Sequence, residues 1–175
     1  MTADNRIAGS PNATARASIK INNAHGTLGN VTGNIVTAAT FEGISCFSPV
    51  IVSGNTVTNS GVGIEIQQAD ADGASVTSNK ILSSSTGIEL SFTTGVVIKS
   101  NTIAKSSVGI EFNCKTGNTV SGNVINDAAT GLHMVPLSST PSDTFFNVAT
   151  IRTDGCGFAR SGAKSSPSPF NHRPE

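Results

Sequence analysis

Residues 76–90 decide the fold: Val76-Thr-Ser-Asn79-Lys-Ile81-Leu-Ser-Ser-Ser-Thr-Gly87-Ile88-Glu89-Leu90. The same pattern returns at 98–112, which read Ile98-Lys-Ser-Asn101-Thr-Ile103-Ala-Lys-Ser-Ser-Val-Gly109-Ile110-Glu111-Phe112. In both copies a β-branched residue stands three positions before an asparagine, and an isoleucine stands two positions after it. Eight positions after the asparagine comes Gly-Ile, then Glu, then an apolar residue. Two copies this similar indicate an internal repeat, which is the first feature to settle in reading a fold.

The repeat extends in both directions along the chain. Asparagine recurs at 34, 55, 79, 101 and 123, in steps of 21, 24, 22 and 22 residues. Three apolar positions recur with it. They are Val31, Val52, Val76, Ile98 and Val120 before the asparagine; Val36, Val57, Ile81, Ile103 and Ile125 after it; and Ile44, Ile64, Ile88, Ile110 and Leu132 after the glycine. Each copy therefore holds three short apolar stretches, too short and too β-branched for helix.

Stacked coils bury these apolar residues in a way that one coil alone does not. Coils in such a stack lie about 4.8 Å apart, so equivalent residues form columns. The repeated asparagine is suited to a sharp turn, with its amide bonded to the asparagines of the neighbouring coils. The repeat predicts an all-β, right-handed parallel β-helix with a 22-residue period and about six coils. An antiparallel sandwich would need hairpin turns every 8–12 residues or so and would not explain the constant period.

The pattern Val-x-x-Asn-x-Ile-x5-Gly-Ile-x-Leu resembles the repeat of right-handed parallel β-helix proteins, the pectate-lyase-like superfamily. Pectate lyases, polygalacturonases and alginate epimerases share it with many surface proteins. The five copies from Val31 to Met134 carry the resemblance. It implies the fold and says little about activity, because one scaffold supports many chemistries.

The repeat also suggests boundaries. Residues 1–16 are expected to form an N-terminal extension or incomplete coil, 17–158 the β-helix, and 159–175 a tail rich in Pro and Ser. The chain shows no apolar segment long enough to span a bilayer and no signal peptide. Its zero net charge and 13% charged residues argue against nucleic acid. Abundant Ser, Thr, Asn and Gly favour an extracellular or cell-surface location, and solenoid ends without cap helices would permit end-to-end contacts or oligomers.

One outward position concentrates charge. The residue between the two apolar residues after each glycine must point outward, and it reads Lys20, Ser45, Glu65, Glu89, Glu111 and His133 down the coils. Neighbouring carboxyls about 5–5.5 Å apart are typical of retaining glycoside hydrolysis, so Glu65, Glu89 and Glu111 are candidate catalytic residues and His133 a candidate binding residue. A solvated acidic face is the interpretation that we favour, with catalysis as the alternative, and we expect Glu89, with a like charge on each side, to have the highest pKa.

A second candidate lies in the spacer from Gln67 to Ser75, the longest in the repeat region. Asp70 and Asp72, followed by Gly73, resemble the beginning of a calcium loop, although the remaining ligands of an EF-hand are absent. A polar turn is the interpretation that we favour for this segment, with the calcium site as the alternative. Cys46 falls on an inward position and is expected to serve as a small core residue. No spacing indicates zinc, and no cofactor other than Ca²⁺ is suggested.

Two function classes follow. The first is a non-catalytic surface module, a scaffold or spike segment that binds a polysaccharide or a protein. The alternative is a carbohydrate-active enzyme, or a fragment of one, of the glycoside hydrolase or polysaccharide lyase type, using the glutamates. The chain has no Trp or Tyr to stack on sugars. Its arginines, at 6, 16, 152, 160 and 173, lie outside the five good copies, which disfavours a lyase because the developing enolate needs a nearby cation.

Overall fold

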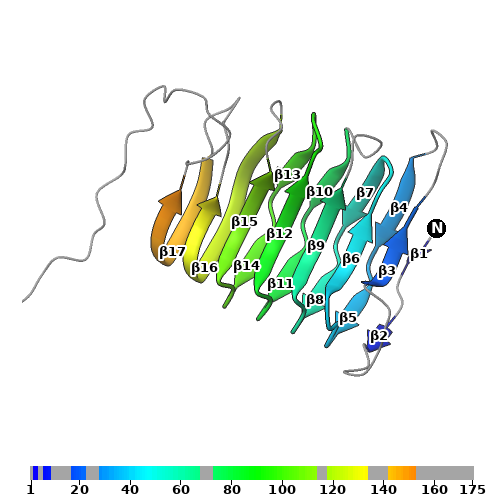
Figure 1. The fold of residues 1–175 in the computed structure, drawn as a ribbon, viewed down its shortest axis with the longest axis horizontal. Coiled ribbons are helices and arrows are strands. Elements are labelled where there is room, and N and C mark those ends of the chain that lie inside the picture. Colours follow the sequence, from blue (N-terminus) through cyan, green and yellow to red (C-terminus); the bar gives the residue numbers. More distant parts are fainter. Residues whose placement is uncertain are drawn as a thin grey trace, which may run out of the picture.

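The computed structural model describes residues 2–3, 6–8, 17–22, 28–67, 73–113, 118–133 and 142–152, and its side chains from 18–22, 28–67, 73–112 and 118–133. In this part of the chain every strand pairing is parallel. The strands form a solenoid in which each coil lies beside the next (Figure 1). The described residues contain no helix long and apolar enough to cross a membrane.

Three parallel sheets run along the solenoid. The first contains β1 (Thr2–Ala3), β4 (Gly29–Thr32), β7 (Val50–Ser53), β10 (Ser75–Thr77) and β13 (Val97–Lys99). The second contains β2 (Arg6–Ala8), β5 (Ile35–Thr37), β8 (Thr56–Thr58), β11 (Lys80–Leu82) and β14 (Thr102–Ala104). The third contains β3 (Ala17–Ile21), β6 (Glu42–Cys46), β9 (Val62–Gln67), β12 (Thr86–Ser91) and β15 (Val108–Asn113). The long strands β16 (Thr119–His133) and β17 (Ser142–Arg152) contribute to all three sheets in turn.

The predicted β-helix is therefore confirmed. Four complete turns, β4–β6 to β13–β15, are followed by β16 as a fifth, and β1–β3 and β17 flank them. The sequence predicted about six coils, so the number of turns agrees closely. Strands β1 and β2 pair with β4 and β5. The predicted boundaries of the extension and the tail stay predictions, and the tail lies outside the described residues.

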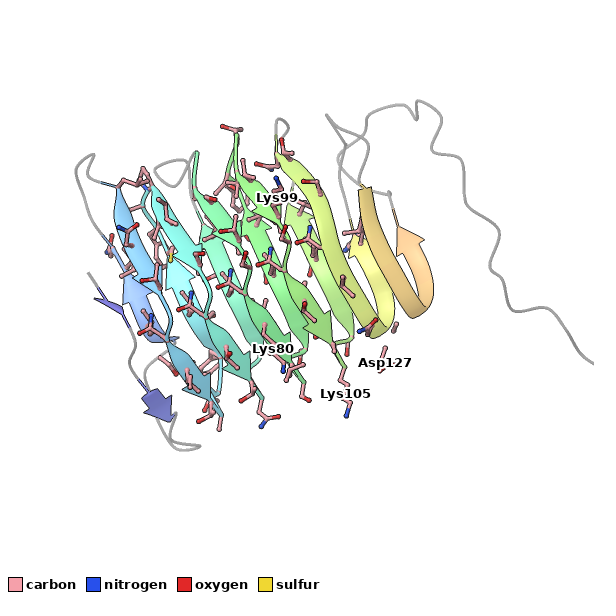
Figure 2. The ribbon with its side chains drawn as sticks, turned by 180° about the vertical axis from the view of Figure 1, so that it is seen from behind. Lys80, Lys99, Lys105 and Asp127 are labelled. Atoms are coloured by element: carbon pink, nitrogen blue, oxygen red, sulfur yellow. The ribbon has the colours of Figure 1, made fainter. Side chains whose placement is uncertain are left out.

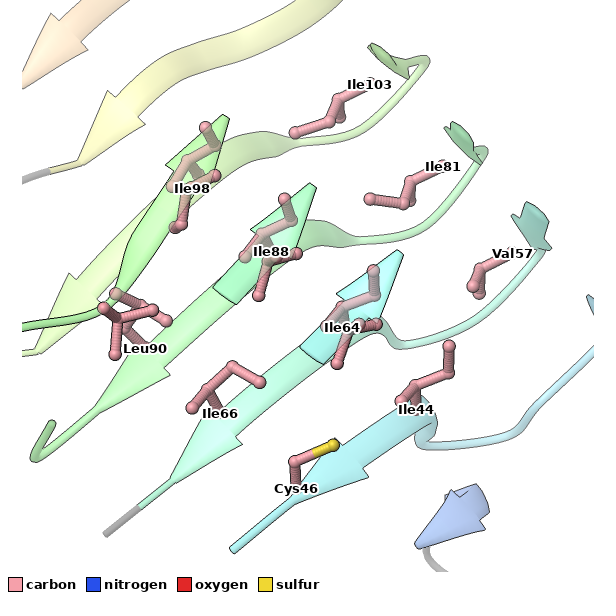
Figure 3. Packing of buried hydrophobic residues seen from close by; sticks show 14 of the residues in the cluster. Ile44, Cys46, Val57, Ile64, Ile66, Ile81, Ile88, Leu90, Ile98 and Ile103 are labelled. Atoms are coloured by element: carbon pink, nitrogen blue, oxygen red, sulfur yellow. The ribbon is translucent and has the colours of Figure 1, made fainter. Parts of the chain in front are cut away.

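The three predicted columns of apolar residues form much of the core. Val76 pairs with Val52 and Ile98 in the first sheet, and Ile81 with Val57 and Ile103 in the second. These side chains are fully buried, as are Ile44, Ile64, Ile88 and Ile110 of the third sheet. Figure 3 shows Ile44, Ile64 and Ile88 following one another in successive coils. Burying one such side chain contributes about 1.5–3 kcal/mol, so the columns carry much of the stability. The period-2 alternation of each strand is what directs them all inward.

The predicted asparagine ladder is also confirmed. It consists of Asn34, Asn55, Asn79, Asn101 and Asn123, all buried. The backbone N–H and the side-chain Nδ2 of Asn79 both donate to Oδ1 of Asn101, at 2.9 and 3.0 Å. The same pair of bonds joins each of the other neighbours. A second proton of Nδ2 reaches a carbonyl, which for Asn101 is that of Val76 at 2.9 Å. The ladder thus satisfies polar groups that the turn buries.

The residue before each ladder asparagine lies in the left-handed region, with φ from 57° to 68°. These residues are Gly33, Gly54, Ser78, Ser100 and Gly122. Left-handed backbone is easiest for glycine, which explains the glycines in this turn. The glycines of the Gly-Ile pairs have another cause. A Cβ on Gly87 would lie 2.5 Å from the carbonyl oxygen of Gly109 and 2.6 Å from Ile103, so only hydrogen fits there.

The period places Asn118 outside the ladder, which predicts that its replacement costs much less than that of a ladder asparagine. The burial of Asn118 argues against this prediction. The Oδ1 of this side chain accepts from the backbone N–H of Val96 at 2.9 Å, and its Nδ2 donates to the carbonyl of Thr93 at 3.2 Å. A buried amide with both bonds made is expensive to remove, so Asn118 also supports the fold.

Candidate functional site

The outer face of the third sheet carries the predicted column of polar residues. Register pairs Lys20 with Ser45, Ser45 with Glu65, Glu65 with Glu89, Glu89 with Glu111 and Glu111 with His133. We call these residues, together with Arg152, which pairs with His133, the outer column. Because adjacent coils lie about 4.8 Å apart, the three glutamates are direct neighbours. The predicted alignment of Glu65, Glu89, Glu111 and His133 is therefore confirmed, whereas their roles stay predictions.

Each carboxylate of the outer column has a hydrogen-bonding or ionic partner. The Ser45 hydroxyl donates to Oε2 of Glu65 at 2.7 Å. The Ser91 hydroxyl donates to Oε1 of Glu89 at 3.1 Å. The Nδ1 of His133 lies 3.3 Å from Oε1 of Glu111. Such partners fix the orientation of the carboxylates and offset part of the repulsion between them.

The outer column is less exposed than the sequence suggested. Only 9% of Glu65 is exposed, and the side chains of Glu111 and His133 are 24% and 31% exposed. Outward direction does not guarantee contact with water here, because side chains stacked at the coil spacing cover one another. The expectation of a freely solvated face was therefore wrong for Glu65, whose carboxylate is buried against Ser45.

The pKa of Glu89 is raised above its usual range, as expected, but the main cause differs. Burial of the carboxyl contributes most, whereas the charges of Glu111, Glu65 and Glu42 contribute less. The hydrogen bond from Ser91 acts in the opposite direction and lowers the pKa. A carboxyl with a raised pKa exchanges protons more readily near neutral pH, which is the property of a general acid. Structural networks produce the same shift, so the pKa alone assigns no role.

A cationic residue that the 22-residue period does not reveal occupies the C-terminal end of the outer column. Arg152 was counted outside the repeats, yet β17 places it in register with His133. The signal was available in Thr150-Ile151-Arg152, a shortened copy of Thr130-Gly131-Leu132-His133. Lys20 occupies the opposite end, where its Nζ lies 4.7 Å from the centre of the Phe47 ring. The acidic residues thus lie between two cationic positions of the same column.

Other faces of the solenoid carry different charges. Figure 2 views the molecule from behind and labels Lys80 on β11, Lys99 on β13, Lys105 after β14 and Asp127 in β16. These four side chains are exposed. They belong to the first and second sheets and to the turns between the second and third sheets. The row of glutamates is therefore a property of the third sheet.

The second candidate site cannot be placed on the fold, since Asp70 and Asp72 lie outside the described residues. In the described part of the chain, no three His, Cys, Asp or Glu side chains come together as a metal site would require. Cys46 takes the inward position predicted for it, fully buried as a free thiol.

Comparison with protein families gives one match. Residues 1–148 match the family described as "Periplasmic copper-binding protein (NosD)". The chain belongs to the NosD family. Neither a curated protein nor a solved structure matches the chain significantly. The family membership agrees with the parallel β-helix repeat, whereas a relationship to pectate lyases receives no support.

The description of the NosD family raises the question of copper ligands. Copper prefers thiolate, thioether and imidazole donors, with Cu(II) also accepting oxygen. Among the described side chains the outer column supplies one imidazole, His133, and otherwise hard carboxylate oxygens. The only described thiol, Cys46, faces the apolar interior. The described residues therefore do not fit a copper site.

Proposed function

We propose that this NosD-family chain is a non-catalytic module acting outside the cytoplasm, and that it binds an extended polysaccharide along the outer face of its third sheet. The observation that carries the proposal is the outer column, in which Glu65, Glu89 and Glu111 are aligned in register. A family described as periplasmic supports the location. A polysaccharide is itself a repeating polymer, so successive sugar units would meet equivalent positions of the outer column in successive coils.

The neighbouring positions favour a polyhydroxylated ligand. Two residues further along the chain, the same face carries the half-buried Phe47 and Gln67 and the buried Ser91; register pairs Gln67 with Ser91. Carboxylates and the Gln67 amide exchange hydrogen bonds with sugar hydroxyls, and the half-buried Phe47 ring offers an apolar surface. The Ser91 hydroxyl instead orients Glu89. No carboxylates align on the first or second sheet in the described part of the chain. The outward column of the first sheet instead aligns hydroxyls with one lysine, at Thr32, Ser53, Thr77, Lys99 and Ser121.

The partners of the carboxylates favour binding over catalysis. A nucleophilic carboxylate must be free to reach the sugar, yet Glu65 is buried and accepts a 2.7 Å hydrogen bond from Ser45. Glu111 is paired with His133. One observation supports the alternative of a glycoside hydrolase: Glu89 has a raised pKa and an adjacent carboxylate on either side, the two features of an acid and nucleophile pair.

A glycan array probed with the full chain, with and without Ca²⁺, tests the proposal. Binding should fall at least about tenfold, or 1.4 kcal/mol, in Glu89→Gln. It should persist in the matched variant Asp127→Asn, which removes an exposed carboxylate elsewhere. Cleavage of a bound polysaccharide that Glu89→Gln abolishes, with the fold intact, would establish the enzyme instead. Failure to bind any glycan would reject the proposal in favour of a protein partner.

A further inference from the structure

The thiol in the described coils is chemically inaccessible to a metal. Cys46 lies in an inward column of the third sheet, where register places it between Ile21 and Ile66. Its side chain is fully buried, and burial together with the charge of Glu65 raises its pKa to about 12. A metal binds the thiolate, so at neutral pH this thiol would have to be both uncovered and deprotonated first. Figure 3 shows it among Ile44, Ile64 and Ile66.

The imidazole in the described coils is engaged as well. Nδ1 of His133 lies 3.3 Å from Glu111, and the next position of the column is Arg152, a cation. On the other side of Glu111, Glu89 accepts the hydrogen bond of Ser91. A copper ion here would find one nitrogen and carboxylate oxygens, without the second nitrogen or sulfur donor that distinguishes copper sites from those of harder metals.

We infer that the coils, as far as the structure describes them, are not a copper site, although the chain belongs to a family described as copper-binding. The coils act as a scaffold in which Cys46 is a core residue and His133 is the partner of Glu111. Copper associated with this chain is then held by groups that belong to neither position. Membership of a family described as copper-binding therefore does not require that the described coils hold the copper.

Copper titration of the full chain tests this inference. Cu(II) is added to the wild type and to His133→Asn, and Cu(I), kept reduced by ascorbate, to the wild type and to Cys46→Ala. Competition with a chelator measures the affinity, and electron paramagnetic resonance reports nitrogen ligands of Cu(II). Circular dichroism verifies that both variants keep the β fold. We expect either no bound copper or the same stoichiometry, affinity and spectrum in wild type and variant.

A tenfold weaker affinity in a folded His133→Asn, or loss of its nitrogen hyperfine lines, would overturn the inference. A tenfold weaker affinity for Cu(I) in a folded Cys46→Ala would also overturn it. A second measurement avoids any dependence on folding of the Cys46 variant. In Cys114→Ser with Cys156→Ser, Cys46 is the only remaining thiol. It should resist a thiol reagent equally with and without Cu(I), whereas accelerated or blocked modification by Cu(I) would contradict us.

Discussion

Two connections in each coil behave differently: the turn between the first and second sheets, and the connection between the third and first sheets. The former always contains two residues, such as 54–55 and 100–101, and always ends in a ladder asparagine. The latter varies from three residues at 47–49 to seven at 68–74. The turn therefore keeps its asparagine, because the buried amides of neighbouring coils must meet there. The connection next to the outer face of the third sheet varies in length. The ladder thus stabilises one edge of each coil, and the proposed binding face adjoins the other.

The largest effect should come from placing a charge in the core. Ile98→Asp should cost more than about 4 kcal/mol or prevent folding, because the carboxylate would be buried without a partner. The neighbouring Val97 is 37% exposed on the same strand. Val97→Asp should change the free energy of unfolding by less than about 1 kcal/mol. Urea unfolding of both variants measures the difference, and similar losses would mean that the strand register is wrong.

Insertions compare the two edges directly. Gly-Ser inserted between Ser100 and Asn101 should destabilise by at least about 3 kcal/mol, since it separates ladder bonds and strand pairings together. The same dipeptide between Ala69 and Asp70 should cost about 1 kcal/mol or less, because it lengthens a connection whose length already differs between coils. Thermal unfolding monitored by circular dichroism decides. If both insertions lowered the thermal stability equally, the two edges would not differ in their contribution to the fold.

Removing one rung of the ladder should have an intermediate effect. Asn101→Ala removes the bonds that Oδ1 accepts from Asn79 and those that Nδ2 donates to Asn123 and to the Val76 carbonyl, and should destabilise by about 1–3 kcal/mol. Asn30→Ala is the matched control, because Asn30 lies half-buried on β4 outside the ladder. It should cost less than about 0.5 kcal/mol. If the ladder bonds contributed nothing to stability, Asn101→Ala and Asn30→Ala would lower the free energy of unfolding by the same amount.

The smallest effect concerns Glu89. Because its pKa is raised in the folded state, the folded chain binds this proton more tightly than the unfolded chain does. Stability should therefore decrease as pH rises through the pKa of Glu89. Glu89→Gln should be slightly more stable than wild type at pH 7, with no advantage at a pH below the usual range of a glutamate. Ser91→Ala, which removes the bond that lowers this pKa, should move the transition to higher pH. An advantage of Glu89→Gln that is independent of pH would contradict this assignment.

Local pattern sufficed for much of this structure. The positions of Val76, Asn79, Ile88 and Glu89 within a coil follow from alternation and period, so the inward columns, the ladder and the alignment of the glutamates could all be predicted.

What could not be predicted depends on contacts between coils. Burial of Glu65 against Ser45, the bond from Ser91 to Glu89 and the two bonds of Asn118 require side-chain conformations that periodicity does not specify. Arg152 was missed for a different reason. Its coil is shorter than 22 residues, and the pairing of β17 with β16 contains register shifts on both sides of the second sheet. A fixed period does not find such a copy.

In the proposed function, the outer column binds a ligand and is not needed to hold the solenoid together. The most direct measurement is the free energy of unfolding at pH 7 of the triple variant Glu65→Gln, Glu89→Gln, Glu111→Gln, beside its binding to the glycan identified on the array. Gln keeps an acceptor for Ser45 and Ser91 and removes the repulsion, so stability should equal or exceed that of wild type while binding is lost. A loss of more than about 1 kcal/mol, beyond what partly exposed ion pairs contribute, with binding retained, would show that the column is structural and would contradict the account.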